Sequence, residues 1–218
     1  MINKGVGTRQ YYETYYSSRD WKIYKSILST IVLYSEPGPV LDVGAGTGFI
    51  VEGGSRWGLD CKGIEGSIDA IRIARERYPA IDIVQGLLSE PLPFPDASFQ
   101  TVVMNEVIEH LETKVATACL GEVYRVLSPG GMLFVASPSR FNKNEKEADP
   151  THINLYSPKE LKRLLYSKGF EDIIPLNTPL SLLGTSYLGK GLMYVLFKLT
   201  KLDHLSATAT CIAYKPIA

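Results

Sequence analysis

The stretch VLDVGAGTGF, residues 40–49, constrains the fold more than any other part of the chain. A short, mostly apolar run, 40–43, leads at once into glycines at 44, 46 and 48. Glycine lets the backbone adopt positive φ and approach a ligand closely, as at the turn from a buried strand into a helix. A dinucleotide-binding turn would read G-x-G-x-x-G, but here the third glycine comes one residue early. The pattern predicts a strand, a ligand-binding turn and a helix.

Apolar periodicity and turn signals extend this pattern along the chain. Helices are expected over 19–34, 49–57, 68–77 and 113–127, and strands over 40–43, 61–65, 81–85, 99–104 and 132–136, with a sharp turn at 128–131. Strands that alternate with helices in this rhythm indicate βαβ units and a parallel sheet. Ligands of such sheets bind beyond the carboxyl ends of the strands, which is where the glycine turn lies.

Composition limits the class of protein. The 218 residues suit one domain, and the 45% of apolar residues can form a core. Lys plus Arg and Asp plus Glu balance at 23 each, so no overall positive charge favours nucleic acid. Three scattered cysteines give no disulfide framework, and the first residues lack the apolar core of a signal peptide. We expect a cytoplasmic protein.

Two carboxylates flank the glycine turn in the sequence. Asp42 precedes Gly44 by two residues and would repel a phosphate, but it suits an ammonium group. Glu65 ends the second predicted strand, 21 residues after Gly44, at the offset where an acidic residue binds ribose hydroxyls. A ribose joined to a cationic tail, without phosphate, describes S-adenosylmethionine.

Five segments, in order, resemble the class I S-adenosylmethionine-dependent methyltransferases. They are closest to the small-molecule group that includes the ubiquinone and menaquinone biosynthesis methyltransferases. The segments are VLDVGAGTG (40–48), Glu65, LPFPDASFQTVVMNEVIEHL (92–111), LSPGGMLFVASPS (127–139) and HINLYSPKELKRLLYSKGF (152–170).

The resemblance implies an α/β, Rossmann-like fold. Its seven-stranded, mostly parallel sheet would have the order 3-2-1-4-5-7-6, with the last strand antiparallel and helices on both faces. Strands six and seven would be 170–176 and 207–215. The whole chain, 1–218, would be one methyltransferase domain. Residues 1–37 would form an N-terminal helical cap or lid, and 179–203 an apolar insertion between strands six and seven.

The resemblance also implies which residues bind the cofactor. Those expected there are Asp42, Gly44, Ala45, Gly46, Gly48, Glu65, Gly66, Leu87, Leu88 and Asn105. Many relatives have an aspartate for the adenine amino group where this chain has Leu87 and Leu88. Base recognition would then depend on apolar contact and backbone groups, at a cost of about 1 kcal/mol, the worth of one hydrogen bond.

His110 and His152 are the candidate catalytic residues. His110 ends the run NEVIEH just past the fourth strand, and His152 lies in the loop before a helix capped by Ser157. If a helical turn began at Glu106, then Glu106, Glu109 and His110 would share one side and could bind a divalent cation. This E-x-x-E-H pattern resembles one credited with metal binding in ubiquinone O-methyltransferases. Segments of this kind also occur in metal-free relatives, so we favour an enzyme without metal.

We therefore predict methyl transfer from S-adenosylmethionine to a small-molecule acceptor, hydrophobic or aromatic, by in-line displacement. The apolar segment 179–202 is interrupted by lysines, so it is no membrane span. It could cover a hydrophobic acceptor or make a peripheral membrane or dimer contact. The alternatives are a non-catalytic domain that binds S-adenosylmethionine or S-adenosylhomocysteine, and, less favoured, a nucleic-acid or protein methyltransferase. Nucleic acid is not an expected partner.

Overall fold

The computed structural model describes residues 9–10, 12–13, 21–142, 149–178, 195 and 202–217. Its helices and 3₁₀ turns are α2 (Trp21–Tyr34), α3 (Phe49–Arg56), α4 (Ile68–Arg77), η1 (Ile108–His110), α5 (Thr113–Val126), α7 (Pro158–Tyr166) and η2 (Asp203–Leu205). Its strands are β1 (Val40–Val43), β2 (Cys61–Glu65), β3 (Ile83–Gln85), β4 (Phe99–Asn105), β5 (Leu127–Pro138), β6 (Glu171–Pro175) and β7 (Thr208–Tyr214).

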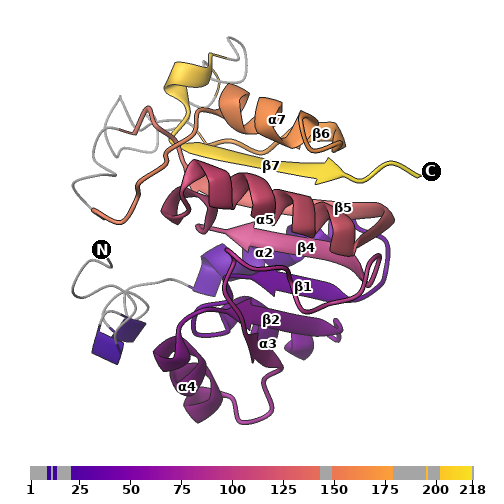
Figure 1. Cartoon of the computed structure of the whole chain (residues 1–218), viewed down its shortest axis with the longest axis vertical. Coiled ribbons are helices and arrows are strands. Elements are labelled where there is room, and N and C mark those ends of the chain that lie inside the picture. Colours follow the sequence, from indigo (N-terminus) through magenta and orange to yellow (C-terminus); the bar gives the residue numbers. More distant parts are fainter. Residues whose placement is uncertain are drawn as a thin grey trace.

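The seven strands form one sheet in the order β3-β2-β1-β4-β5-β7-β6, which confirms the predicted topology. The pairs from β3 to β5 are parallel, whereas β7 runs antiparallel to both β5 and β6. Figure 1 shows this succession, with β6 and β7 at one end of the sheet and β2 with α4 toward the other. β1 lies near the middle of the sheet and is buried along its whole length. The glycine turn that follows β1 therefore starts from a rigid support.

Helices cover both faces of the sheet, as predicted. Side chains of α2, α3 and α4 pack on one face with Val40 and Val103, and those of α5 and α7 pack on the other with Leu41 and Val102. The alternation of neighbouring residues such as Val40 and Leu41 between the two cores follows from the two-residue period of a strand. Burial on both faces explains why the strands are almost continuously apolar.

Two strands differ from the expected bounds by two residues or more. β3 starts at Ile83 rather than at residue 81, and β5 starts at Leu127 rather than at 132. The segment 128–131 is therefore not a separate turn. Its backbone joins the sheet, because Gly130 N–H donates to the Lys215 carbonyl and Lys215 N–H donates to the Gly131 carbonyl. The register shift between Phe99 and Thr101 of β4 accommodates the longer strand.

Two other expectations concern parts that the structure covers only in small measure. Of the predicted cap over 1–37, α2 is described, whereas most of 1–20 lies outside the described residues. The apolar insertion 179–203 lies outside them too, apart from residues 195, 202 and 203. Among the helices that are described, none has the length and apolar character needed to cross a membrane. All three cysteines are buried and unbridged.

Glycine is required at two positions of the turn after β1. Gly44 has φ +74°, and a Cβ there would lie 2.5 Å from Cγ2 of Val107. Gly48 has φ +83°, and a Cβ there would lie 2.2 Å from Cδ1 of Ile81. Both positions combine a left-handed backbone with a close neighbour, so a side chain would be strained twice over.

We predict that Gly48→Ala destabilises the protein much more than Gly58→Ala. Gly58 also has positive φ, +81°, but a Cβ there would meet nothing within 4 Å. The Gly58 variant should lose about 1–2 kcal/mol, the cost of left-handed backbone at a residue with a side chain. The Gly48 variant should lose a further ~1–3 kcal/mol from overpacking. Urea denaturation measures both losses, and equal losses would contradict the packing argument.

Candidate functional site

A cavity of about 470 Å³ opens at the carboxyl ends of β1, β2 and β4, and its volume is typical of small-molecule sites. The residues that line it are Tyr12, Tyr24, Asp42, Gly44, Ala45, Gly46, Phe49, Ile50, Glu65, Gly66, Leu87, Leu88, Ser89, Asn105, Glu106, Val107, His110, Leu111, Val115 and Thr151. Most of the predicted cofactor residues are in this set. Gly48 and His152 are not.

The carboxylate of Glu65 connects the end of β2 to the glycine turn. One oxygen accepts a 2.8 Å hydrogen bond from Gly46 N–H, and the other accepts a 2.8 Å bond from Ser67 N–H. The two oxygens of a carboxylate can together accept about four hydrogen bonds, so Glu65 retains capacity for a ligand. Glu65 is thus oriented before any ligand arrives, with its side chain at the cavity wall.

Asp42 and Glu65 form a buried acidic pair. Burial, and after it the charge of Glu65, raises the pKa of Asp42 to about 8. Burial also raises the pKa of Glu65, although hydrogen bonds from the backbone of Ser67, Gly46 and Gly66 oppose this. A ligand with positive charge would relieve the repulsion, because it favours the ionised form of both groups. An anionic ligand such as a pyrophosphate would increase the repulsion.

Aromatic and apolar side chains form another part of the wall. The rings of Tyr24 and Phe49 stack with their centroids 4.8 Å apart and an interplanar angle of 10°. Leu87, on the β3 side, is 52% exposed although it lies at the cavity. An exposed leucine at the rim offers apolar surface to a flat ring.

Glu106 does not take the position that the sequence suggested for it. Its φ is +55°, and only Ile108–His110 form a 3₁₀ turn. The left-handed backbone separates Glu106 from that turn, so the expected helical alignment of Glu106 with Glu109 and His110 does not form. Instead His152 approaches the other two residues from a different segment.

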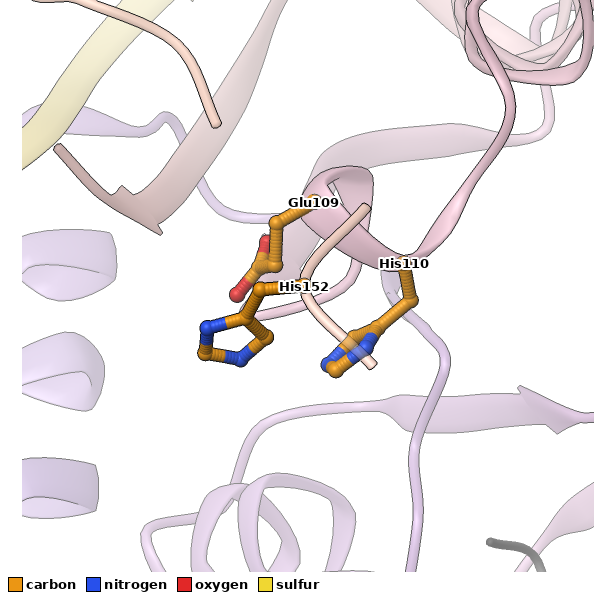
Figure 2. A group of neighbouring side chains, drawn as sticks. All are labelled: Glu109, His110 and His152. Carbon is orange, nitrogen blue, oxygen red and sulfur yellow. The ribbon is translucent and has the colours of Figure 1, made fainter. Parts of the chain in front are cut away.

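Glu109, His110 and His152 form the cluster drawn in Figure 2. Glu109 and His110 come from η1, and the ring of His152 lies edge-on to that of His110, with centroids 4.9 Å apart. One potential ligand atom from each residue lies within 4.8 Å of the others. Two histidines and a carboxylate are a donor set that transition metals accept, but two ligands of one zinc ion lie at most about 4.2 Å apart. No other group of this kind occurs in the described part of the chain.

Sequence reasoning missed two residues beside His110. Nδ1 of His110 lies 2.9 Å from the hydroxyl of Thr151, which also lines the cavity. That hydroxyl in turn donates a 2.6 Å hydrogen bond to Asp149. Burial, and then the neighbouring His152, lowers the pKa of His110. The ring is therefore neutral at pH 7 and can accept a proton.

Comparison with known proteins finds similarity to methyltransferases. Residues 41–135 match the family model described as a methyltransferase domain. A probable S-adenosylmethionine-dependent methyltransferase from Mycolicibacterium smegmatis is 35% identical over 135 residues, which is 61% of this chain and 51% of that protein. A demethylmenaquinone methyltransferase from Renibacterium salmoninarum is 39% identical over 98 residues, 44% of this chain and 40% of that protein.

Among solved structures, phosphoethanolamine N-methyltransferase 2 of Haemonchus contortus, in complex with S-adenosyl-L-methionine, aligns with a TM-score of 0.73. The alignment covers 99% of this chain and 59% of that one at 18% sequence identity, so it shows a shared fold. The chain spans about half of the length of the curated relatives it matches.

We predict that Asp42→Asn stabilises the empty protein at alkaline pH. The pKa of Asp42 rises from its usual value near 3.9 to about 8 on folding, so ionisation opposes folding increasingly as the pH rises through that window. The variant and the parent should melt alike at pH 4. At pH 8 the variant should melt at a temperature higher by ~2–4 °C for each kcal/mol of Asp42 ionisation cost that the substitution removes.

Thermal denaturation across pH 4–9 measures this difference, and Asp60→Asn, which alters an exposed carboxylate, is the control. A melting difference that stays constant with pH would contradict the raised pKa of Asp42.

Proposed function

We propose that this chain, whose residues 41–135 match the methyltransferase-domain family model, transfers a methyl group from S-adenosylmethionine to a small apolar acceptor. The observation that carries the proposal is the buried acidic pair beside the glycine turn. Asp42 and Glu65 are 4% and 9% exposed and lie in one cavity. Such a pair disfavours phosphate and favours a ribose that carries a cationic tail.

The residues of the cavity fit this cofactor. The bare backbone of Gly44 and Gly46 allows the methionine part to approach, with Asp42 beside its amino group. Glu65 would accept a hydrogen bond from the ribose hydroxyls, since the backbone amides do not use the full capacity of its carboxylate. The exposed side chain of Leu87 would pack against the adenine. This apolar contact would take the place of the hydrogen bond expected from an aspartate at this position.

The acceptor would bind on the side of η1 and α5. Val107, Leu111 and Val115 line the cavity there together with His110. Three aliphatic side chains and one neutral imidazole suit an apolar molecule whose accepting atom carries a removable proton. The relative from Renibacterium salmoninarum, a demethylmenaquinone methyltransferase by name, supports an acceptor of that kind.

Catalysis would rest on alignment and on proton removal. When bound, the cofactor supplies a sulfonium methyl group. Its carbon accepts the electron pair of the acceptor, and the electrons of the broken carbon–sulfur bond stay on the sulfur. Nε2 of His110 would take the acceptor's proton and later release it to water. The stacked rings of Tyr24 and Phe49 would exclude water from one wall of the cavity.

We predict that Glu65→Ala weakens the binding of S-adenosylhomocysteine. Loss of hydrogen bonds to a charged group should cost about 1.5–3 kcal/mol, or roughly tenfold to 150-fold in affinity. Isothermal calorimetry measures the change. Glu90→Ala, at an exposed carboxylate outside the cavity, should bind like the parent. Unchanged affinity in a folded Glu65 variant would rule out the ribose role.

We predict that His110→Ala reduces turnover by about 10²–10⁴-fold, the range for a general base, while affinity for S-adenosylhomocysteine stays within about twofold. Steady-state assays with labelled cofactor and a panel of apolar hydroxylated acceptors measure turnover. Parent activity that a chelator abolishes and zinc restores would instead favour the metal interpretation of Figure 2. Binding without turnover on any acceptor would favour a non-catalytic domain.

A further inference from the structure

We propose that Asp149 and Thr151 are positioning residues that hold His110 in its Nδ1–H tautomer and so leave the Nε2 lone pair as the proton acceptor. The inference deepens the proposed function, since it explains how the candidate base is prepared. Neither residue belongs to the elements that bind the cofactor. Both lie in the loop 149–154, which precedes α7.

The direction of the hydrogen bonds starts at Asp149. One carboxylate oxygen receives the hydroxyl of Thr151 at 2.6 Å and the backbone N–H of the same residue at 2.9 Å. Burial raises the pKa of Asp149, but the hydrogen bonds from Thr151, together with the charges of His152 and His110, outweigh it and the pKa is lowered. An ionised carboxylate can only accept hydrogen bonds. The single hydroxyl proton of Thr151 is therefore committed to Asp149.

The state of His110 follows from that commitment. Because the Thr151 hydroxyl donates its hydrogen to Asp149, its oxygen can only accept a hydrogen bond from Nδ1 of His110, which lies 2.9 Å away. The Thr151 carbonyl, 3.3 Å from the same nitrogen, can also only accept. Both partners thus require a proton on Nδ1. A neutral imidazole carries one proton, so Nε2 keeps its lone pair.

The surroundings keep His110 neutral until it accepts a proton. Burial and the neighbouring His152 lower its pKa, whereas the Thr151 carbonyl, Asp149 and Glu106 raise it by smaller amounts. Glu109, the carboxyl group of the cluster, lies on the same turn as His110. After proton transfer both ring nitrogens of His110 are donors, and the imidazolium gains the attraction of Asp149 through Thr151. The proton then leaves Nε2 for water, which restores the starting state.

The loop that carries Asp149 and Thr151 is fastened to the turn that carries His110. Asn154 N–H donates to the Glu109 carbonyl at 2.9 Å, and the Asn154 amide donates to the Leu111 carbonyl at 3.2 Å. These bonds flank His110 in the sequence. They fix the loop against η1, so the short contacts to the imidazole persist without help from the cofactor.

The tautomer can be measured directly on the full chain with ¹⁵N-labelled histidine. The chain has three histidines, and His110→Asn identifies the signal of interest by its loss. We expect the parent protein to show His110 protonated at Nδ1 at pH 7, without cofactor or acceptor. A His110 ring protonated at Nε2 in the parent would overturn the proposal, and this measurement needs no variant to fold.

Variants then separate positioning from structure. Thr151→Val, which keeps the shape but removes the hydroxyl, should shift His110 toward the Nε2–H tautomer. It should lower kcat by about tenfold to a hundredfold, with affinity for S-adenosylhomocysteine unchanged. Asp149→Ala, which removes the acceptor of the Thr151 hydroxyl proton, should do the same, and Thr151→Ser should restore both readouts. Thr117→Val is the control, because the Thr117 hydroxyl donates to the Thr113 carbonyl within α5. An unchanged His110 tautomer in both loss variants would overturn the proposal.

The two proposals fail in different ways. A chain that binds no S-adenosylmethionine refutes the proposed function, whatever the histidine signals show. A chain that binds and methylates, but whose His110 tautomer does not depend on Thr151, refutes only the positioning role.

Discussion

The hydrogen bond from Gly46 N–H to the carboxylate of Glu65 is the contact on which the candidate site depends. It joins the turn after β1 to the end of β2, and so sets the distance between the backbone of the glycine turn and the carboxylate of Glu65. On either side of Gly46, Gly44 and Gly48 have left-handed backbones, and a Cβ at either position would lie within 2.5 Å of a neighbouring side chain. The sheet edge, the glycine turn and the Glu65 carboxylate therefore form one unit, and residues of this unit line the cavity.

Burial of Asp42 beside Glu65 costs stability in the empty protein, because two carboxylates share a space with little water. Sites that bind charged ligands often carry such a cost. A cation placed between the sheet edge and the acidic pair removes the repulsion. On the proposed function, the same feature that weakens the fold at high pH would favour a positively charged nucleoside in the cavity.

The sequence carried enough local information to predict the sheet order, the glycine turn and the two carboxylates, since each depends on residues close together in the chain or on a family pattern. The helical alignment of Glu106 was wrong, because its left-handed backbone has no signature in a run such as NEVIEH. The turn at 128–131 was wrong because backbone pairing with Lys215 overrides local turn propensity. Thr151 and Asp149 could not be found, since Thr151 meets His110 across 41 residues of chain.

The most direct test of the account is calorimetric titration of the full chain with S-adenosylmethionine at pH 7, repeated in two buffers of different ionisation enthalpy. If a cation settles beside Asp42, the group should release a proton, and the observed heat of binding should differ between the buffers. Saturable binding with such a difference is the predicted result. Absence of binding, or binding whose heat is the same in both buffers, would contradict the central claim that a buried acidic pair selects the cofactor by its charge.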